Sequence, residues 1–321
     1  MDRLYRPVID IRMPDAYLYG MISPSTVYIL RDDFTYPRPN EYAEVARILP
    51  SIGGEAANSA IVLSKLGLST RLDGNWINSM SAHRVLQTME SYGVDVSRLE
   101  VKDGFGTEEI VIADRTSRTV FGSYAAFHSG PRQWNQPRRE DVRDAAVVCL
   151  DPFFRGEAEL AARLCVEEGK PYVTLDAPHE SYIARNAAAL AISHELRDRE
   201  YAGRDMREVF DAYLRTCAGL VIFTFGSDEL WYARPGGRLQ TLKPYAIKPV
   251  DTTGAGDAFR GTIAYGLFKG WDDEKTVRFA SAAAACVCLT MPHALNAPGL
   301  DGVLAFMDEQ KMKGAASLPP L

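Results

Sequence analysis

The chain has 321 residues, of which 46% are hydrophobic and 24% are charged, and its formal net charge at pH 7 is −6. This balance is that of a folded globular protein and argues against an intrinsically disordered chain. The acidic charge argues against sequence-independent binding of nucleic acid, which needs a basic surface. A local site for a small anion stays open, because backbone amides bind anions without net positive charge.

The cysteines and the apolar runs bear on where the protein works. The five cysteines are an odd number and lie in apolar runs, which predicts free thiols and a reducing compartment. The N-terminal residues 1–15 contain three arginines and no apolar stretch long enough for a signal peptide, and no run reaches the length of a membrane span. We therefore expect a cytoplasmic protein with neither a membrane nor a nucleic acid as its partner.

The first part of the chain predicts a strand, a polar β segment, a helix and a hairpin. Residues 16–21 have the composition of a strand, and residues 26–49 are rich in β-branched and aromatic side chains. Residues 55–66 follow helical periodicity and end at Gly67, a residue type that commonly terminates a helix. Residues 107–123 have the pattern of a hairpin with a polar tip.

The middle of the chain alternates apolar runs with helical segments. Four continuous apolar runs predict buried strands, at 145–150, 171–175, 190–193 and 219–224. Residues 157–168 between the first two runs are helical in pattern, and a further hairpin is expected over 229–245. Buried strands that alternate with helices are typical of a mostly parallel sheet covered on both faces.

These segments together predict an α/β fold: a three-layer α/β/α, doubly wound, mostly parallel sheet with a small β-sheet lid. The lid is expected because the polar β segments, about 22–50 and 104–124, are too polar on one face to be buried parallel strands. We expect one domain over residues 16–310. A frayed tail is expected over residues 311–321, which contain one glycine and two prolines.

The segment most informative about function is Asp-Thr-Thr-Gly-Ala-Gly-Asp-Ala-Phe-Arg-Gly at 251–261. It follows a short β-like stretch at 246–250 and opens a segment of helical periodicity. The turn formed by Gly254, Ala255 and Gly256 leaves amides unpaired at the positive end of a helix, and its small residues let an anion approach the backbone. This geometry predicts a site for the transferring phosphoryl group of a nucleotide.

Asp257 falls in the first turn of that predicted helix. A helix-capping carboxylate is the simpler interpretation of an acid in this position. A carboxylate beside a bound phosphate repels it, however, and that cost makes sense if the carboxylate accepts the proton of an attacking hydroxyl. The absence of Gly-Lys-Ser/Thr excludes a Walker loop, and the spacing of the glycines excludes a dinucleotide-binding fingerprint.

Two motifs, standing in this order, resemble the signatures of the ribokinase-like (PfkB) carbohydrate kinases. The first is Gly-Gly-Glu-Ala-Ala-Asn at 53–58, and the second is the 251–261 segment. The resemblance extends over about residues 16–307. It implies ATP-dependent phosphotransfer, with Mg²⁺, to a hydroxyl of a small sugar or sugar-like acceptor.

The resemblance also implies roles for single residues. Asp257 matches the catalytic base, and Gly254, Ala255 and Gly256 match the anion hole. Residues on the acceptor side are expected at Gly53, Gly54, Asn58 and, where the family usually has an acid, Ser23 or Ser25. Residues on the nucleotide side are expected at Thr224, Gly226 and Asn296. Metal-binding roles are implied for Glu195, in a degraded Asn-x-x-Glu motif near Mg²⁺, and for Asp251 and Thr253, near a K⁺ ion in potassium-activated members.

Two alternatives remain open from the sequence. A nucleoside kinase of the same fold is favoured by the loss of the sugar-side acid. A kinase-like protein that senses a ligand without turnover is favoured by the degraded Asn-x-x-Glu motif. The sequence does not name the acceptor or the hydroxyl that is phosphorylated. The exposed edge of the lid sheet favours a homodimer through the lid.

Overall fold

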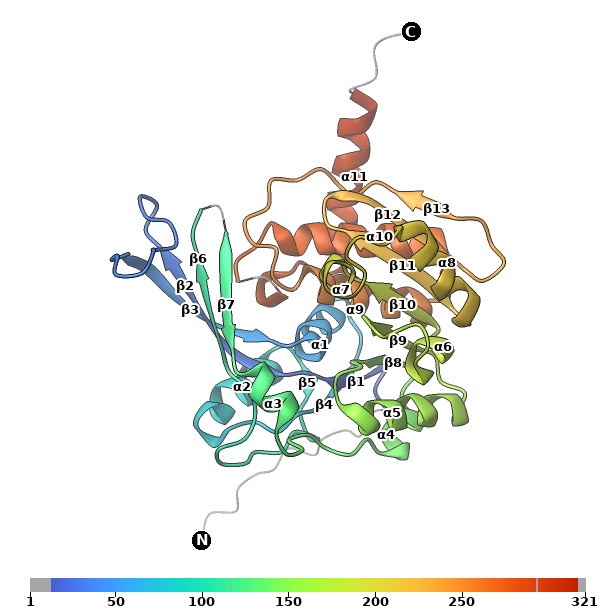
Figure 1. Cartoon of the computed structure of the whole chain (residues 1–321), viewed down its shortest axis with the longest axis horizontal. Helices are drawn as coiled ribbons and strands as arrows, with labels where there is room; N and C mark the ends of the chain where they lie inside the picture. Colours follow the sequence, from blue (N-terminus) through green and yellow to red (C-terminus); the bar gives the residue numbers. More distant parts are fainter. Residues whose placement is uncertain (1–12, 116, 293, 317–321) are drawn as a thin grey trace.

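The computed structural model describes residues 13–115, 117–292 and 294–316, and it is built around a nine-stranded sheet (Figure 1). The strand order is β13-β12-β11-β10-β9-β8-β1-β4-β5. All neighbours pair in parallel except β12 and β13, which add an antiparallel edge after β11. The strands are β1 (Ala16–Gly20), β4 (Thr70–Gly74), β5 (Val94–Asp95), β8 (Val147–Leu150), β9 (Tyr172–Leu175), β10 (Ala189–Ile192), β11 (Leu220–Phe225), β12 (Asp228–Ala233) and β13 (Gln240–Leu242).

The sheet is buried on both faces, as the continuous apolar runs predict. Along β1, Ala16 and Leu18 belong to the core on one face, whereas Tyr17 and Tyr19 belong to the core on the other. Side chains in a strand alternate between the two faces, so a run with no polar positions requires helices on both sides.

One layer of helices covers the face of the sheet that carries Leu18, and the other layer covers the face that carries Tyr19. The first layer holds α1 (Glu55–Lys65), α2 (Ser79–Ser91), α9 (Ala255–Phe268), α10 (Asp273–Cys288), the short η1 (Ala294–Asn296) and α11 (Leu300–Ala316). The second holds α3 (Tyr124–Ser129), α4 (Arg139–Asp144), α5 (Arg155–Glu167), α6 (Tyr182–Asn186), α7 (His194–Glu200) and α8 (Met206–Thr216).

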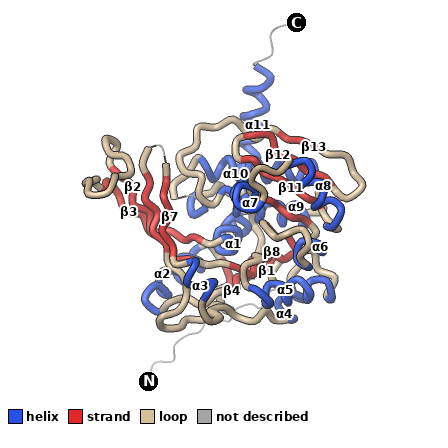
Figure 2. The backbone as a smooth tube through the Cα atoms, viewed as in Figure 1, coloured by secondary structure: helices blue, strands red, loops and turns tan. Residues whose placement is uncertain are grey.

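A second, four-stranded sheet extends to the left of the main body (Figures 1 and 2). Its order is β3-β2-β6-β7, and its strands are β2 (Ser23–Leu30), β3 (Val45–Gly53), β6 (Glu109–Ala113) and β7 (Arg118–Gly122). Val27, Val111 and Ala113 form a small core on its inner face, against which Met291 of the main body packs. We call this sheet the lid.

These observations confirm the predicted fold class, and they correct two details. Residues 246–250 form no strand; instead the amides of Val250 and Asp251 donate to the carbonyl of Cys288, so the end of α10 holds this loop. The expected tail is helical as far as Ala316, because no helix-breaking proline occurs before Pro319. Residues 317–321 of that expected tail lie outside the described part of the chain.

Among residues 13–115, 117–292 and 294–316, no helix combines the length and the apolar character that crossing a membrane requires.

Candidate active site

The start of α9 has the open geometry that the glycine-rich motif predicts. Gly254 precedes the helix in the left-handed conformation, with φ of 70°, and no side chain caps the helix. The first bond of the helix runs from the amide of Ala258 to the carbonyl of Gly254 over 2.9 Å. Amides ahead of Ala258 therefore have no partner within the helix. A Cβ placed on Gly256 would meet no atom within 4 Å, so an anion has room to approach the backbone there.

Asp257 is held beside these amides by α1. The Nδ2 of Asn58 donates to Asp257 Oδ2 over 2.7 Å, and the hydroxyl of Ser59 donates to the carbonyl of Asp257 over 2.9 Å. The two helices approach closely because Gly261 has no side chain: a Cβ there would lie 3.2 Å from that of Ser59. Burial raises the pKa of Asp257, while the positive charge of Arg260 and the hydrogen bond from Asn58 act in the opposite direction.

A buried ion pair between Arg260 and Asp151 connects the elements that lie beneath the site. Arg260 and Asp151 are both fully buried, and the guanidinium contacts Asp151 Oδ1 while it donates to the hydroxyl of Ser59 over 2.9 Å. The other oxygen of Asp151 accepts the amide of Met21 over 2.7 Å. The network joins the ends of β1 and β8 to α1 and α9, and it leaves the charge of Arg260 neutralised by a partner.

The predicted diglycine lies where the lid joins the main body. Gly53 ends β3, and Gly54 precedes α1 with φ of 92°. A Cβ on Gly54 would lie 2.4 Å from the carbonyl oxygen of Met21, and a Cβ on Gly53 would lie 2.2 Å from Glu109 Oε1. A side chain at position 54 would collide with the backbone, so Gly54 is required, whereas one at position 53 would displace the flexible end of Glu109.

Several polar groups on the inner side of the lid lack partners. The hydroxyls of Ser23 and Ser25 and the Oδ1 of Asn58 are buried, with no hydrogen-bond partner in the described part of the chain. Ser25 lies opposite Glu109 in the β2–β6 pairing, and the hydroxyl of Tyr124 donates to Glu109 Oε2. Buried groups of this kind usually bond to something, so they are candidates for contact with a ligand. We call Ser23, Ser25, Asn58, Glu109 and Tyr124 the inner polar cluster.

Sequence reasoning missed Glu109. The signal was an acid in a strand whose next alternate positions, Val111 and Ala113, are apolar, because alternate residues share one face of the sheet. That pattern places Glu109 on the inner face, and in the structure only 9% of its surface is exposed.

The three residues predicted on the nucleotide side stand apart from these contacts. Thr224 lies near the end of β11, where its hydroxyl donates to the carbonyl of Ile192 over 3.3 Å, and Gly226 follows with φ of 66°. The exposed Asn296 donates from Nδ2 to the carbonyl of Met291 over 2.8 Å. Among the hydrogen bonds of the described residues, none joins these three to Asn58 or Asp257. Thr224 and Gly226 lie at the carboxyl ends of the parallel strands, where sheets of this type bind ligands.

The metal-binding roles differ in how well the residues fit them. Glu195 is exposed at the start of α7, and its charge raises the pKa of the neighbouring Asp176, whose burial has the larger effect in the same direction. No group of three or more His, Cys, Asp or Glu side chains able to hold a metal occurs in the described residues. Mg²⁺ bound with a nucleotide needs only one or two carboxylates besides the phosphates, so the exposed Glu195 fits it. Both oxygens of Asp176 already accept hydrogen bonds, from the amide and the hydroxyl of Ser193.

The two residues expected near a monovalent cation face an arginine of the lid. Asp251 Oδ1 accepts the amide of Thr253 over 2.8 Å and its hydroxyl over 2.6 Å. The guanidinium of Arg118, on β7, contacts the hydroxyl of Thr253 and lies 3.9 Å from Asp251 Oδ1. A cation of the protein thus stands next to this carboxylate, and it links the lid to the loop that precedes the anion hole.

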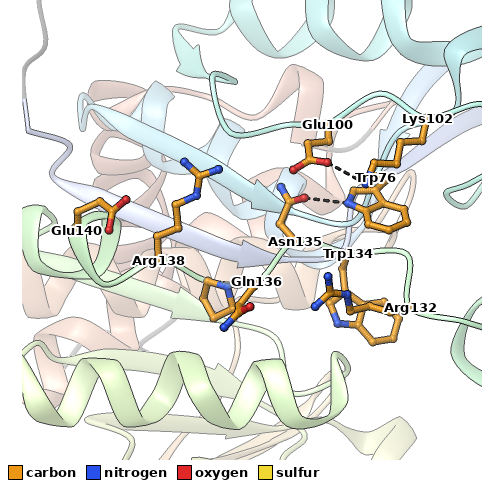
Figure 3. Close-up of a pocket in the computed structure, with 10 residues that line it drawn as sticks. Trp76, Glu100, Lys102, Arg132, Trp134, Asn135, Gln136, Arg138 and Glu140 are labelled. Atoms are coloured by element: carbon orange, nitrogen blue, oxygen red, sulfur yellow. Dashed lines mark hydrogen bonds and ion pairs between the residues drawn. The ribbon is translucent and has the colours of Figure 1, made fainter.

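A separate groove of about 460 Å³ opens between Trp76, Lys102 and Arg138 (Figure 3). Its polar side chains largely pair with one another: Trp76 Nε1 donates to Asn135 Oδ1 over 2.9 Å, and Lys102 Nζ lies 2.9 Å from Glu100 Oε2. None of the residues predicted for the site lines this groove. This groove is therefore separate from the candidate site at α9.

Comparison with known proteins agrees with this geometry. The family model described as "pfkB family carbohydrate kinase" matches residues 25–297. Two relatives are 5-dehydro-2-deoxygluconokinases: that of Bacillus velezensis is 24% identical over 304 residues (86% of this chain and 90% of the relative), and that of Clostridium beijerinckii is 20% identical over 287 residues (81% and 85%).

Solved structures of low sequence identity share the fold. The ribokinase of Arabidopsis thaliana, complexed with ribose and ATP, matches with a TM-score of 0.74 and 19% identity over 92% of this chain and 98% of that one. The nucleoside kinase of Burkholderia thailandensis, in complex with inosine, matches with a TM-score of 0.69 and 18% identity over 92% and 96%. With a family model that spans most of its length, this chain belongs to the PfkB family of carbohydrate kinases.

Proposed function

We propose that this kinase transfers the γ-phosphoryl group of ATP to a hydroxyl of a small sugar or sugar-like acceptor, with Asp257 as general base. The observation that carries the proposal is the position of the Asp257 carboxylate, bonded to Asn58 beside the uncapped amides of α9. A proton acceptor and an anion site at one helix start are what in-line transfer to a hydroxyl needs.

Each group has a separate task in the proposed reaction. The acceptor lies between Gly53 and Asp257, and Asp257 takes the proton of the attacking hydroxyl. Asn58 holds the carboxylate in place through its 2.7 Å hydrogen bond. The amides of the Gly254–Gly256 turn stabilise the negative charge on the transferring group. Glu195 would help to hold Mg²⁺ with the phosphates, and the ion would neutralise charge on the nucleotide.

The lid completes the site in this proposal. Its inner face supplies Glu109, which accepts the hydroxyl of Tyr124 on α3, and Arg118, which contacts Thr253, so it meets the main body at two places. A closed lid excludes water from the anion hole, which suppresses hydrolysis of ATP without an acceptor.

The relatives suggest which acceptors to test in a phosphotransfer assay. The names and complexes of the relatives point to a gluconate-type acid, to ribose and to inosine. A coupled assay of ADP release with these three kinds of acceptor tests phosphotransfer directly. If no ADP were released with any of these acceptors, the result would favour a ligand sensor that lacks turnover.

The variant Asp257→Asn tests the general base. We expect kcat to fall by about 10² to 10⁴ at saturating substrates, the range that general-base catalysis contributes. Because burial raises the pKa of Asp257, its ionised form destabilises the fold above the ordinary carboxylate pKa. The variant should therefore have a higher Tm than the wild type at pH 7, and this difference should vanish at acidic pH.

The exposed Asp103 serves as a matched control, since Asp103→Asn makes the same change far from the motif. It should keep wild-type kcat and Tm. Near-wild-type turnover by Asp257→Asn would show that the base is assigned wrongly.

A further inference from the structure

Glu109 is a buried carboxylate that the proposed reaction does not require. It lies on the inner face of the lid against Gly53, where a Cβ would come within 2.2 Å of its Oε1. Its other oxygen accepts the hydroxyl of Tyr124. No lysine or arginine pairs with it among the ion pairs of the described residues. A carboxylate in this position faces whatever lies between the lid and Asp257.

The free hydrogen-bonding capacity near Glu109 is mainly that of acceptors. Glu109 and Asp257 are carboxylates, and the Oδ1 of Asn58 is buried and unpartnered. All three require donors, and the hydroxyls of Ser23 and Ser25 can serve as either donor or acceptor. Sugar hydroxyls donate hydrogen bonds, whereas ionised carboxylate and phosphate groups cannot. The inner polar cluster is thus matched to a ligand rich in hydroxyls.

The charged residues around Glu109 also favour an uncharged ligand. Glu55, at the start of α1, has a pKa raised well above its ordinary range by burial, with the charges of Asp151 and Asp257 adding to the effect. Arg260, the cation in this network, is occupied by Asp151 and Ser59. Arg118 lies on the side of Thr253 and Asp251. An anionic group beside Glu109 would be repelled, since no lysine or arginine of the described residues forms an ion pair with Glu109.

We propose that the acceptor is an uncharged polyhydroxylated molecule, and that Glu109 excludes acceptors with a carboxylate or phosphate group. The inference rests on the proposed function, because it places the acceptor beside Asp257. It assigns to a lid residue the hydroxyl-binding role that the sequence left open at Ser23 and Ser25. It also separates this chain from an enzyme built for an aldonate, whose carboxylate would need a cation.

The test compares acceptors with and without an anionic group. D-ribose, D-fructose and inosine represent neutral acceptors, and D-gluconate, 5-dehydro-2-deoxygluconate and fructose 6-phosphate represent anionic ones. We expect kcat/KM of the wild type for the best neutral acceptor to exceed that for the best anionic acceptor by about 100-fold or more. Glu109→Gln should lower this ratio about tenfold or more, chiefly through KM, because it removes a charged hydrogen-bond partner and the repulsion together.

Two controls separate selectivity from folding. Glu108→Gln changes the exposed residue immediately before β6 and should leave the ratio and the KM for ATP unchanged. Tyr124→Phe removes the hydrogen bond to Glu109 and keeps the charge, so it should retain discrimination against anions. If Tyr124→Phe lost discrimination as fully as Glu109→Gln, Glu109 would have a structural role and the proposal would fail.

The outcomes also distinguish this inference from the proposed function. A wild-type enzyme that prefers an anionic acceptor, or a ratio unchanged by Glu109→Gln, would overturn the inference while phosphotransfer stands. If none of the six acceptors supported ADP release, the proposed function itself would be overturned. Thermal shifts with the same six compounds then decide the ligand class: stabilisation by neutral compounds supports it, and stabilisation by anionic compounds alone, or by none, refutes it.

Discussion

At the scale of single residues, the contact between Asn58 and Asp257 explains why two distant motifs occur together. The residues are 199 positions apart and meet over 2.7 Å between α1 and α9. The first motif supplies the amide that holds the carboxylate, and the second supplies the carboxylate and the proposed anion hole. Neither motif alone provides both a proton acceptor and a fixed direction for it.

This contact predicts a change in pH dependence. The hydrogen bond from Asn58 lowers the pKa of Asp257, so its removal in Asn58→Leu should raise that pKa. A general base works when ionised, and the acidic limb of the kcat profile should therefore move to higher pH. Measurement of kcat from pH 5 to pH 9 should show this shift of the acidic limb in Asn58→Leu. Asn186→Ala, on α6 in the other helical layer, should leave the limb in place, and a limb that moves to lower pH in Asn58→Leu would contradict the assignment.

At the scale of elements, the start of α9 has no side-chain cap, although the amide of Ala255 donates to the carbonyl of Thr252 over 3.4 Å. Gly254 turns the chain in the left-handed conformation, and α9 has no side-chain cap. Three other long helices are capped by a side chain, Asn78 at α2, Asp205 at α8 and Asp272 at α10, whereas α1 and α5 start without one, as α9 does. An uncapped start that faces open space suits an anion from outside the chain.

The variant Gly256→Ala tests the anion hole without disturbing the fold. A Cβ at Gly256 meets nothing within 4 Å, and alanine is favoured over glycine in a helix by about 1 kcal/mol. We expect a Tm equal to or above that of the wild type, yet kcat lower by about 10² to 10³, since the methyl group occupies the approach of the phosphoryl group.

Gly156→Ala is its matched control. Gly156 is likewise the second residue of a helix, α5, and a Cβ there also meets nothing within 4 Å. It should gain the same stability and keep full kcat. Equal kcat in both variants would place the phosphoryl group elsewhere.

At the scale of the whole molecule, the lid has two faces with different roles. Its inner face carries Glu109 and Arg118, which contact the main body. Its outer face exposes apolar side chains: Ile48 is 57% exposed, Ile110 44% and Phe121 47%, and Ile110 lies opposite Phe121 in the β6–β7 pairing. Apolar side chains gathered on one face of a sheet mark a surface for association.

We therefore expect a homodimer through the lid. The double variant Ile48→Glu/Ile110→Glu should shift the mass from dimer to monomer in light scattering after size exclusion, because it buries charge in the interface. Val166→Glu, at a 45% exposed position on α5, should leave the mass unchanged. A wild-type monomer at micromolar concentration would show this expectation to be wrong.

The sequence by itself determined the parallel sheet, the lid segments and the anion-hole motif. Buried strands and helix starts leave local patterns, since side-chain alternation and glycine-rich turns depend on neighbours in the chain. It failed at 246–250, where a β-like composition forms a loop held by Cys288.

Only the tertiary structure decided which residues complete the acceptor side. The sequence marked Ser23 and Ser25 as positions where an acid is expected and absent. Parallel pairing of β2 with β6 then sets Glu109 directly opposite Ser25, 84 positions along the chain. The register of two distant strands follows from packing across the whole lid. Local alternation can therefore place Glu109 on the inner face, but only the folded chain sets it opposite Ser25.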